Sequence, residues 1–245
     1  MKHFRIALLV ICSFLLPGNH IYSQNLNYQT PDLNDWIDSQ ITVGMDSFNI
    51  AGATIVLLHR DSILHISGYG LADIESNTPV NYNSSIFGVG SVSKTFVATA
   101  IMQLYEDGKL ELDRDVNSYI KSFQLEYKFN DPITLRHILT HTAGFDVSNI
   151  GTAVRVEKDV IPLAQYLKKR MPPQIRPAGK VISYSNQGYA LLGLVVEEVS
   201  GLPFYEYINQ KILQPLEMDY SGFKRQTELK AYYATSYLQK GGQLI

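Results

Sequence analysis

The chain has 245 residues, 45% of them hydrophobic and 18% charged, a composition typical of globular proteins with enough apolar side chains for a sizeable core. Its formal net charge of −2 gives no electrostatic reason to expect nucleic acid as a partner. The single cysteine, Cys12, lies in the N-terminal segment, which excludes disulfides and cysteine-ligated metals from the rest of the chain.

Residues 1–23 have the composition of a secretory signal peptide. Lys2 and Arg5 supply the positive charge, and the apolar run 6–16 is too short to span a bilayer. Ser23 offers a small residue for cleavage before Gln24. We expect a secreted or periplasmic protein with no stable membrane span after signal cleavage. The alternative is that this segment stays attached as an N-terminal membrane anchor.

The first predicted elements are a helix and a β-hairpin. A helix beginning at 31–33 would place four apolar residues on one face, namely Leu33, Trp36, Ile37 and Ile41. The runs 51–58 and 63–69 are short and rich in β-branched residues, which predicts a hairpin of buried strands. His59 and His65 fall within this hairpin, and we interpret them as sheet residues rather than metal ligands.

A serine and a lysine three residues apart begin the next helical pattern. Ser91 and Lys94 follow a Gly-Val-Gly turn, and the apolar residues after them keep helical spacing up to Asp107. A serine hydroxyl becomes a good nucleophile when a neighbouring base takes its proton, so this pair is suited to covalent catalysis. The same S-x-x-K spacing recurs at 118–121 and 221–224, where no glycine turn leads into a helix.

The run 132–145 contains two histidines, His137 and His141, at a spacing of four. This spacing can form a zinc pair on a helix, but a zinc protease would have glutamate where this chain has Ile138. The run therefore predicts a short helix that is capped near Thr134, and no metal site.

A third distinctive stretch is Tyr184-Ser185-Asn186, which precedes a strongly apolar helix predicted at 189–199. Taken alone, Tyr184 could be a packing residue and Asn186 a turn residue. Another helix is predicted at 204–213.

Together these stretches resemble the serine β-lactamase-related family of class C β-lactamases, D-alanyl-D-alanine carboxypeptidases and esterases. The matching motifs are Ser91-Val92-Ser93-Lys94, the run 135–144, and Tyr184-Ser185-Asn186. The segments 201–204 and 215–218 also match the family, so the resemblance covers roughly residues 32–236.

The resemblance implies an α+β fold of the β-lactamase/transpeptidase type, in which an α/β sandwich is joined to an all-α domain. On this basis residues 24–87 would form the N-terminal part of the α/β domain. Residues 88–223 would form the mostly helical domain that carries both motifs. Residues 224–245 would begin the return to the α/β domain, and the fold would be incomplete without its C-terminal strands.

The resemblance also implies a role for each site residue. Ser91 would be the nucleophile, Lys94 and Tyr184 would handle its proton, and Asn186 would bind the substrate amide or the lysine. Which of Lys94 and Tyr184 is the base is left open. The substrate would be a β-lactam, a peptidoglycan stem peptide ending in D-Ala-D-Ala, or an ester, with no metal or organic cofactor. The Tyr-x-Asn motif favours the class C and esterase branches.

One element of the family pattern is missing from the sequence. The family carries Lys-Thr-Gly or His-x-Gly on a later strand, which supplies one of two oxyanion N–H groups. Lys240-Gly241-Gly242 follows Tyr184 too closely to be this strand. The hairpin at 51–69 would then have an open edge. Two hypotheses follow: a serine hydrolase, or a catalytically impaired fragment or binding relative.

Overall fold

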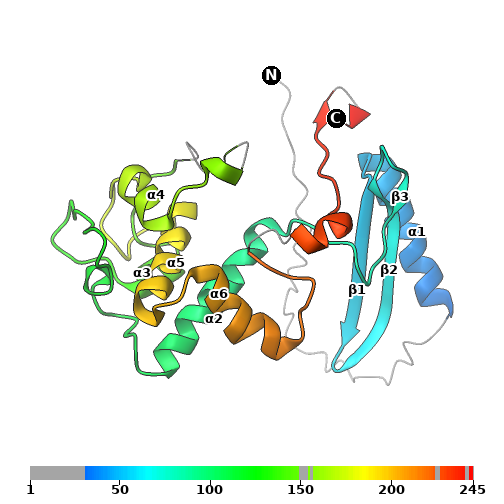
Figure 1. Ribbon diagram of the computed structural model, residues 1–245. Coiled ribbons are helices and arrows are strands. Elements are labelled where there is room, and N and C mark those ends of the chain that lie inside the picture. Colours follow the sequence, from blue (N-terminus) through cyan, green and yellow to red (C-terminus); the bar gives the residue numbers. More distant parts are fainter. Residues whose placement is uncertain (1–30, 149–153, 155–156, 224–226, 241–242, 245) are drawn as a thin grey trace, which may run out of the picture.

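The computed structural model describes residues 31–148, 154, 157–223, 227–240 and 243–244. The predicted signal peptide, with Cys12, lies outside these residues. The described elements form two groups, a small sheet with one long helix and a cluster of helices (Figure 1). The boundaries expected at 87/88 and 223/224 remain a prediction.

The sheet is built on the predicted hairpin. Strand β1 (Gly52–His59) pairs antiparallel with β2 (Ser62–Asp73), and β3 (Thr78–Pro79) pairs with the other edge of β2. Helix α1 (Pro31–Phe48) lies on one face of this sheet (Figure 1). Within the described part of the chain, β1 has a strand on one side only, so its other edge is open.

Two expectations about burial in this group are wrong. Trp36 was expected to share one apolar face of α1 with Ile37, yet 61% of Trp36 is exposed, whereas Ile37 is buried. The hairpin strands were expected to be buried, yet Val56 and Leu58 of β1 are exposed. The physical reason is that among the described residues only α1 covers the sheet, and a single helix shields a narrow stripe of side chains.

The second group consists of helices around one central helix, α5 (Asn186–Ser200). In the described residues its other α-helices are α2 (Ser93–Glu106), α3 (Leu135–Leu139), α4 (Leu163–Arg170) and α6 (Phe204–Ile208). All four contact α5 or a helix that does, and the six consecutive residues 191–196 of α5 are buried. No helix in the described ranges has both the length and the hydrophobicity to cross a bilayer.

The hydrophobic core lies in this helical group. Its large side chains with almost no exposure belong to α5 and to the segments packed around it. They are Ile101, Leu104, Val116, Ile133, Leu135, Ile138, Leu167, Leu191, Leu192, Leu194, Val195 and Ile208. Burying one such side chain contributes about 1.5–3 kcal/mol to stability. The helices that carry the two motifs are therefore anchored in the best-packed part of the molecule.

Capping side chains set the starts of α5 and α3, and the start of α5 differs from the sequence expectation. Helix α5 begins at Asn186, three residues earlier than expected, because the Ser185 side chain accepts a hydrogen bond from the Gly188 N–H and caps the helix. Thr134 caps α3 as predicted, and His137 completes the capping box by accepting a bond from the Thr134 N–H. The helix predicted at 204–213 is α6 followed by a π-helical turn, Asn209–Leu213.

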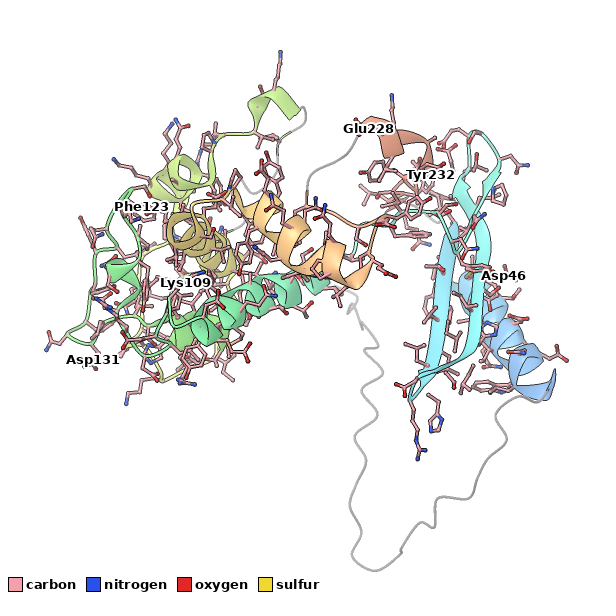
Figure 2. The ribbon with its side chains drawn as sticks, turned by 60° about the horizontal axis from the view of Figure 1, so that its bottom comes forward. Asp46, Lys109, Phe123, Asp131, Glu228 and Tyr232 are labelled. Atoms are coloured by element: carbon pink, nitrogen blue, oxygen red, sulfur yellow. The ribbon has the colours of Figure 1, made fainter. Side chains whose placement is uncertain are left out.

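The chain after the helical group returns to the sheet. The 3₁₀ turn Thr227–Tyr232 lies beside the strands, where Figure 2 shows its Glu228 and Tyr232 side chains. The Ile86 N–H donates to the Tyr232 carbonyl, and the Thr235 N–H donates to the Ala72 carbonyl. Beyond this contact, β4 (Gln239–Lys240) and β5 (Gln243–Leu244) pair with each other. Gly241 and Gly242 of the Lys-Gly-Gly sequence lie outside the described residues.

Candidate active site

Ser91 lies on a tight turn at the start of α2. The 3₁₀ turn Gly90–Val92 precedes the α-helix, which begins at Ser93 rather than at Ser91 as the helical pattern suggested. Side chains three residues apart lie on one face of a helix, so the turn and the first residues of α2 bring Ser91 and Lys94 together. The start of α2 lies in the middle of the molecule, between the two groups of elements (Figure 1).

Lys94 links the serine to the second motif. Its ammonium donates to Ser91 Oγ at 3.1 Å and to Asn186 Oδ1 at 2.8 Å. The same nitrogen lies 4.7 Å from the centroid of the Tyr184 ring and 5.8 Å from that of Tyr189. Lys94, one of the two partners expected for Asn186, is therefore in contact with it. Two aromatic faces and two oxygen acceptors hold the charge of Lys94 beside the serine.

Tyr184 forms a second hydrogen bond with the same serine. Its hydroxyl donates to Ser91 Oγ at 2.6 Å, across a separation of 93 residues in the chain. Hydrogen bonding from Lys94, then the hydrogen bond with Ser91, lowers the pKa of Tyr184 below its ordinary value. Nearly half of Tyr184 is exposed, and Ser91 is exposed as well, so both residues are accessible from solvent.

The S-x-x-K sequence at 118–121, which the structure describes in full, builds no such site. Ser118 donates to the Asp115 carbonyl, and Lys121 donates to the Glu198 carbonyl, so their side chains point to different partners. Lys224 of the third sequence lies outside the described residues. The convergence of lysine, tyrosine and asparagine therefore distinguishes Ser91 from Ser118.

His141 is a site residue that the sequence analysis missed. Its Nδ1 accepts a hydrogen bond of 3.2 Å from the Ser185 N–H, and its ring lies between two tyrosines. The ring centroid is 4.5 Å from that of Tyr184 and 4.9 Å from that of Tyr189. The run 132–145 drew attention to this histidine only as half of a metal pair. The hydrogen bonds of His137 and His141 go instead to Thr134 and Ser185.

Known proteins share extended sequence similarity with this chain. The Beta-lactamase family model matches residues 37–244. Among curated proteins, the putative penicillin-binding protein PbpX of Bacillus subtilis (strain 168) is 30% identical over 192 residues, covering 78% of this chain and 46% of its own length.

Solved structures of related proteins also share the fold of this chain. The octameric penicillin-binding protein homologue from Pyrococcus abyssi superposes with a TM-score of 0.75 at 30% identity, covering 86% of this chain and 49% of that one. EstCE1, a hydrolase with promiscuous acyltransferase activity, has a TM-score of 0.75 at 25% identity, covering 86% of this chain and 58% of that one. The chain thus spans about half the length of these relatives.

Proposed function

Because this chain belongs to the Beta-lactamase family, we propose that Ser91 is the nucleophile of a serine hydrolase that works through a covalent acyl-enzyme. The Ser91 oxygen attacks the carbonyl carbon of an amide or ester while its proton passes to a neighbouring base. The carbonyl then re-forms and expels the amine or alcohol, which takes a proton from the site. Attack by water on the acylated serine releases the acid.

One observation carries this proposal: the Lys94 ammonium and the Tyr184 hydroxyl both lie within hydrogen-bond distance of Ser91 Oγ. A nucleophile and its base must be within such reach of each other. Because the pKa of Tyr184 is lowered, we assign Tyr184 as the group that accepts the serine proton once it is ionised. Lys94 stabilises that phenolate, and Asn186 orients Lys94.

The substrate class is part of the same proposal. PbpX and the P. abyssi homologue are named for penicillin binding, and EstCE1 is named as a hydrolase. We propose a β-lactam, a D-Ala-D-Ala-type peptide or an ester as substrate. In all three, a serine oxygen attacks an acyl carbon, and the exposed Ser91 and Tyr184 leave room for it.

A catalytically impaired or purely binding relative is the competing proposal. In the part of the chain that the structure describes, no strand bearing Lys-Thr-Gly or His-x-Gly lies beside Ser91 to supply a second oxyanion donor. Loss of one such donor costs roughly 2.7–4 kcal/mol of transition-state stabilisation. A catalytically impaired relative would still acylate slowly without turnover, a purely binding relative would form no adduct, and an intact hydrolase would also turn over.

The experiment combines labelling with turnover. The purified chain is incubated with a fluorescent penicillin, a chromogenic cephalosporin and a short-chain p-nitrophenyl ester, and the acyl adduct is located by intact-mass and peptide mass spectrometry. We expect an adduct on Ser91 that disappears in Ser91→Ala and persists in Ser118→Ala, the matched control from the other S-x-x-K sequence. An adduct without turnover supports the impaired relative. Equal labelling of the chain and Ser91→Ala rules out Ser91 as the nucleophile.

We also propose that the protein is secreted or periplasmic, on the strength of the charged and apolar pattern of residues 1–23. Intact-mass analysis of the exported protein should show a new N-terminus at Gln24. Retention of residues 1–23 on exported protein would instead indicate the membrane anchor.

A further inference from the structure

His141 has a backbone conformation that histidine rarely adopts. Its φ angle is +58°, in the left-handed region, directly after the last turn of α3. A side chain with a Cβ is disfavoured there, and glycine or asparagine is the usual residue. Strained residues persist where the surrounding structure holds them in place, and they concentrate at functional sites. The contacts of His141 show what holds it.

His141 accepts hydrogen bonds from the residues on both sides of Tyr184. Its carbonyl accepts a bond of 2.7 Å from the Ser183 N–H, and its Nδ1 accepts the bond from the Ser185 N–H. The ring also packs between the Tyr184 and Tyr189 rings, and the Tyr189 hydroxyl is itself fixed by a bond of 2.9 Å to the Leu139 carbonyl. The register and the ring plane of Tyr184 are therefore both set by contacts of one residue.

We propose that His141 is a positioning residue for Tyr184, and that it does this in its neutral form with the proton on Nε2. This inference rests on the proposed role of Tyr184 as the base. An Nδ1 that accepts from a backbone N–H carries no proton, which assigns the tautomer. A protonated ring would turn this acceptor into a donor facing the Ser185 N–H, and it would release the chain beside Tyr184.

The electrostatic surroundings keep this ring neutral. The groups that face it are Lys94 from α2, Tyr184 from the segment before α5, and Tyr189 from α5 itself. Lys94 is the charged member of this set. Burial, followed by repulsion from Lys94, lowers the pKa of His141 below its ordinary value. Tyr184 therefore stays aligned at neutral pH, and the alignment fails only in acid.

Two substitutions separate the parts of this role. His141→Asn retains an acceptor close to the position of Nδ1 and is tolerated in the left-handed region, but it cannot titrate. His141→Phe retains the ring and removes the acceptor. His59→Phe, the same change at an exposed histidine of the hairpin, is the matched control. Thermal unfolding of each variant shows which of them fold.

The first readout is the ionisation of Tyr184, followed by NMR of ¹³Cζ-labelled tyrosine with Tyr184→Phe for assignment. This measurement needs no turnover. We expect His141→Phe to raise the pKa of Tyr184 by about half a unit or more, because the displaced hydroxyl loses Lys94 and Ser91. His141→Asn and His59→Phe should leave it nearly unchanged.

The second readout is the pH dependence of Ser91 acylation by fluorescent penicillin. Below the pKa of Tyr184 the logarithm of the rate should fall with a slope of about one, and this slope should steepen to about two once His141 is protonated. His141→Asn should lose the steeper part. His141→Phe should acylate roughly 10²-fold more slowly, since a small misplacement of a catalytic group has that effect.

The two proposals fail in different ways. If His141→Phe folds and leaves the Tyr184 ionisation unchanged, His141 does not position Tyr184, whether or not the chain is acylated. If the Tyr184 ionisation moves as expected but no variant or parent chain is acylated, the positioning role is supported and the hydrolase function is wrong.

Discussion

At the scale of single residues, the site depends on the coupling of Tyr184 to Lys94. The phenolate of Tyr184 gains a hydrogen bond and a nearby positive charge from the lysine, and the bond with Ser91 adds to this. Both effects favour the charged form of the phenol, so its pKa falls. In the proposed reaction, Lys94 would therefore act through Tyr184 as well as through its own bond to Ser91.

Lys94→Met tests this coupling. Removal of the hydrogen-bond donor and of its charge should raise the pKa of Tyr184 toward the ordinary tyrosine value of about 10. The base would then be ionised only at higher pH, so acylation of Ser91 should slow at neutral pH. NMR titration of ¹³Cζ-labelled tyrosine measures the shift. Lys121→Met, from the second S-x-x-K sequence, should leave the Tyr184 titration unchanged, and an equal titration in both variants would contradict the coupling.

At the scale of elements, turns after helices set where the motif segments lie. Gly144 follows α3 with a φ angle of +78°, and its carbonyl accepts bonds of 2.8 and 3.2 Å from the Ile175 and Arg176 N–H groups. A Cβ on Gly144 would stand 2.1 Å from the Arg176 carbonyl oxygen. This close contact joins the histidine-containing run to the chain that leads into Tyr184.

Gly144→Ala should therefore be considerably more destabilising than Gly108→Ala. Gly108 also has a positive φ, +69°, but its Cβ would meet no atom within 4 Å, so its substitution costs only the backbone penalty of about 1–2 kcal/mol. At Gly144 the overpacking against backbone adds roughly 1–3 kcal/mol. Urea unfolding of both variants measures the difference. Equal losses of unfolding free energy would show that the backbone at Arg176 shifts away from the new Cβ without loss of stability.

Local patterns predicted most of these elements correctly. The hairpin, the helix after Ser91 and the cap at Thr134 follow from spacing and from residue types within a few positions. The start of α5 was missed because the Ser185 side chain caps the helix three residues before the apolar pattern begins. The different exposure of Trp36 and Ile37 could not be predicted, because it depends on which elements cover α1. Helical spacing carries no information about those elements.

At the scale of the whole molecule, the family and its fold are confirmed. The family model covers residues 37–244, and the likeness to solved structures extends over 86% of the chain. The α+β class and the β-lactamase/transpeptidase-like arrangement therefore hold for this chain. Its sheet group, however, exposes apolar side chains, since α1 is the one layer that covers it in the described residues.

This exposed apolar surface predicts self-association. Val56 and Leu58 are more than half exposed on an open edge strand, which is a template for pairing with another chain. Leu58→Lys should reduce the apparent mass measured by light scattering at increasing protein concentration. Edge pairing would bury the lysine charge, which opposes association. Leu216→Lys, at an exposed leucine of the helical group, should not. Equal apparent masses of the two variants would show that self-association does not use the edge of β1.

The sequence alone determined the family, the first hairpin, the main helices and the identity of Ser91, Lys94, Tyr184 and Asn186 as site candidates, because each of these patterns is local. Only the tertiary structure decided that Tyr184 meets Ser91 across 93 residues and that His141 holds Tyr184 in place. The physical reason is that such contacts depend on how α2, α3 and α5 pack on one another. Side-chain spacing along one segment fixes neighbours within a turn, whereas the shared core of several helices fixes the distances between segments.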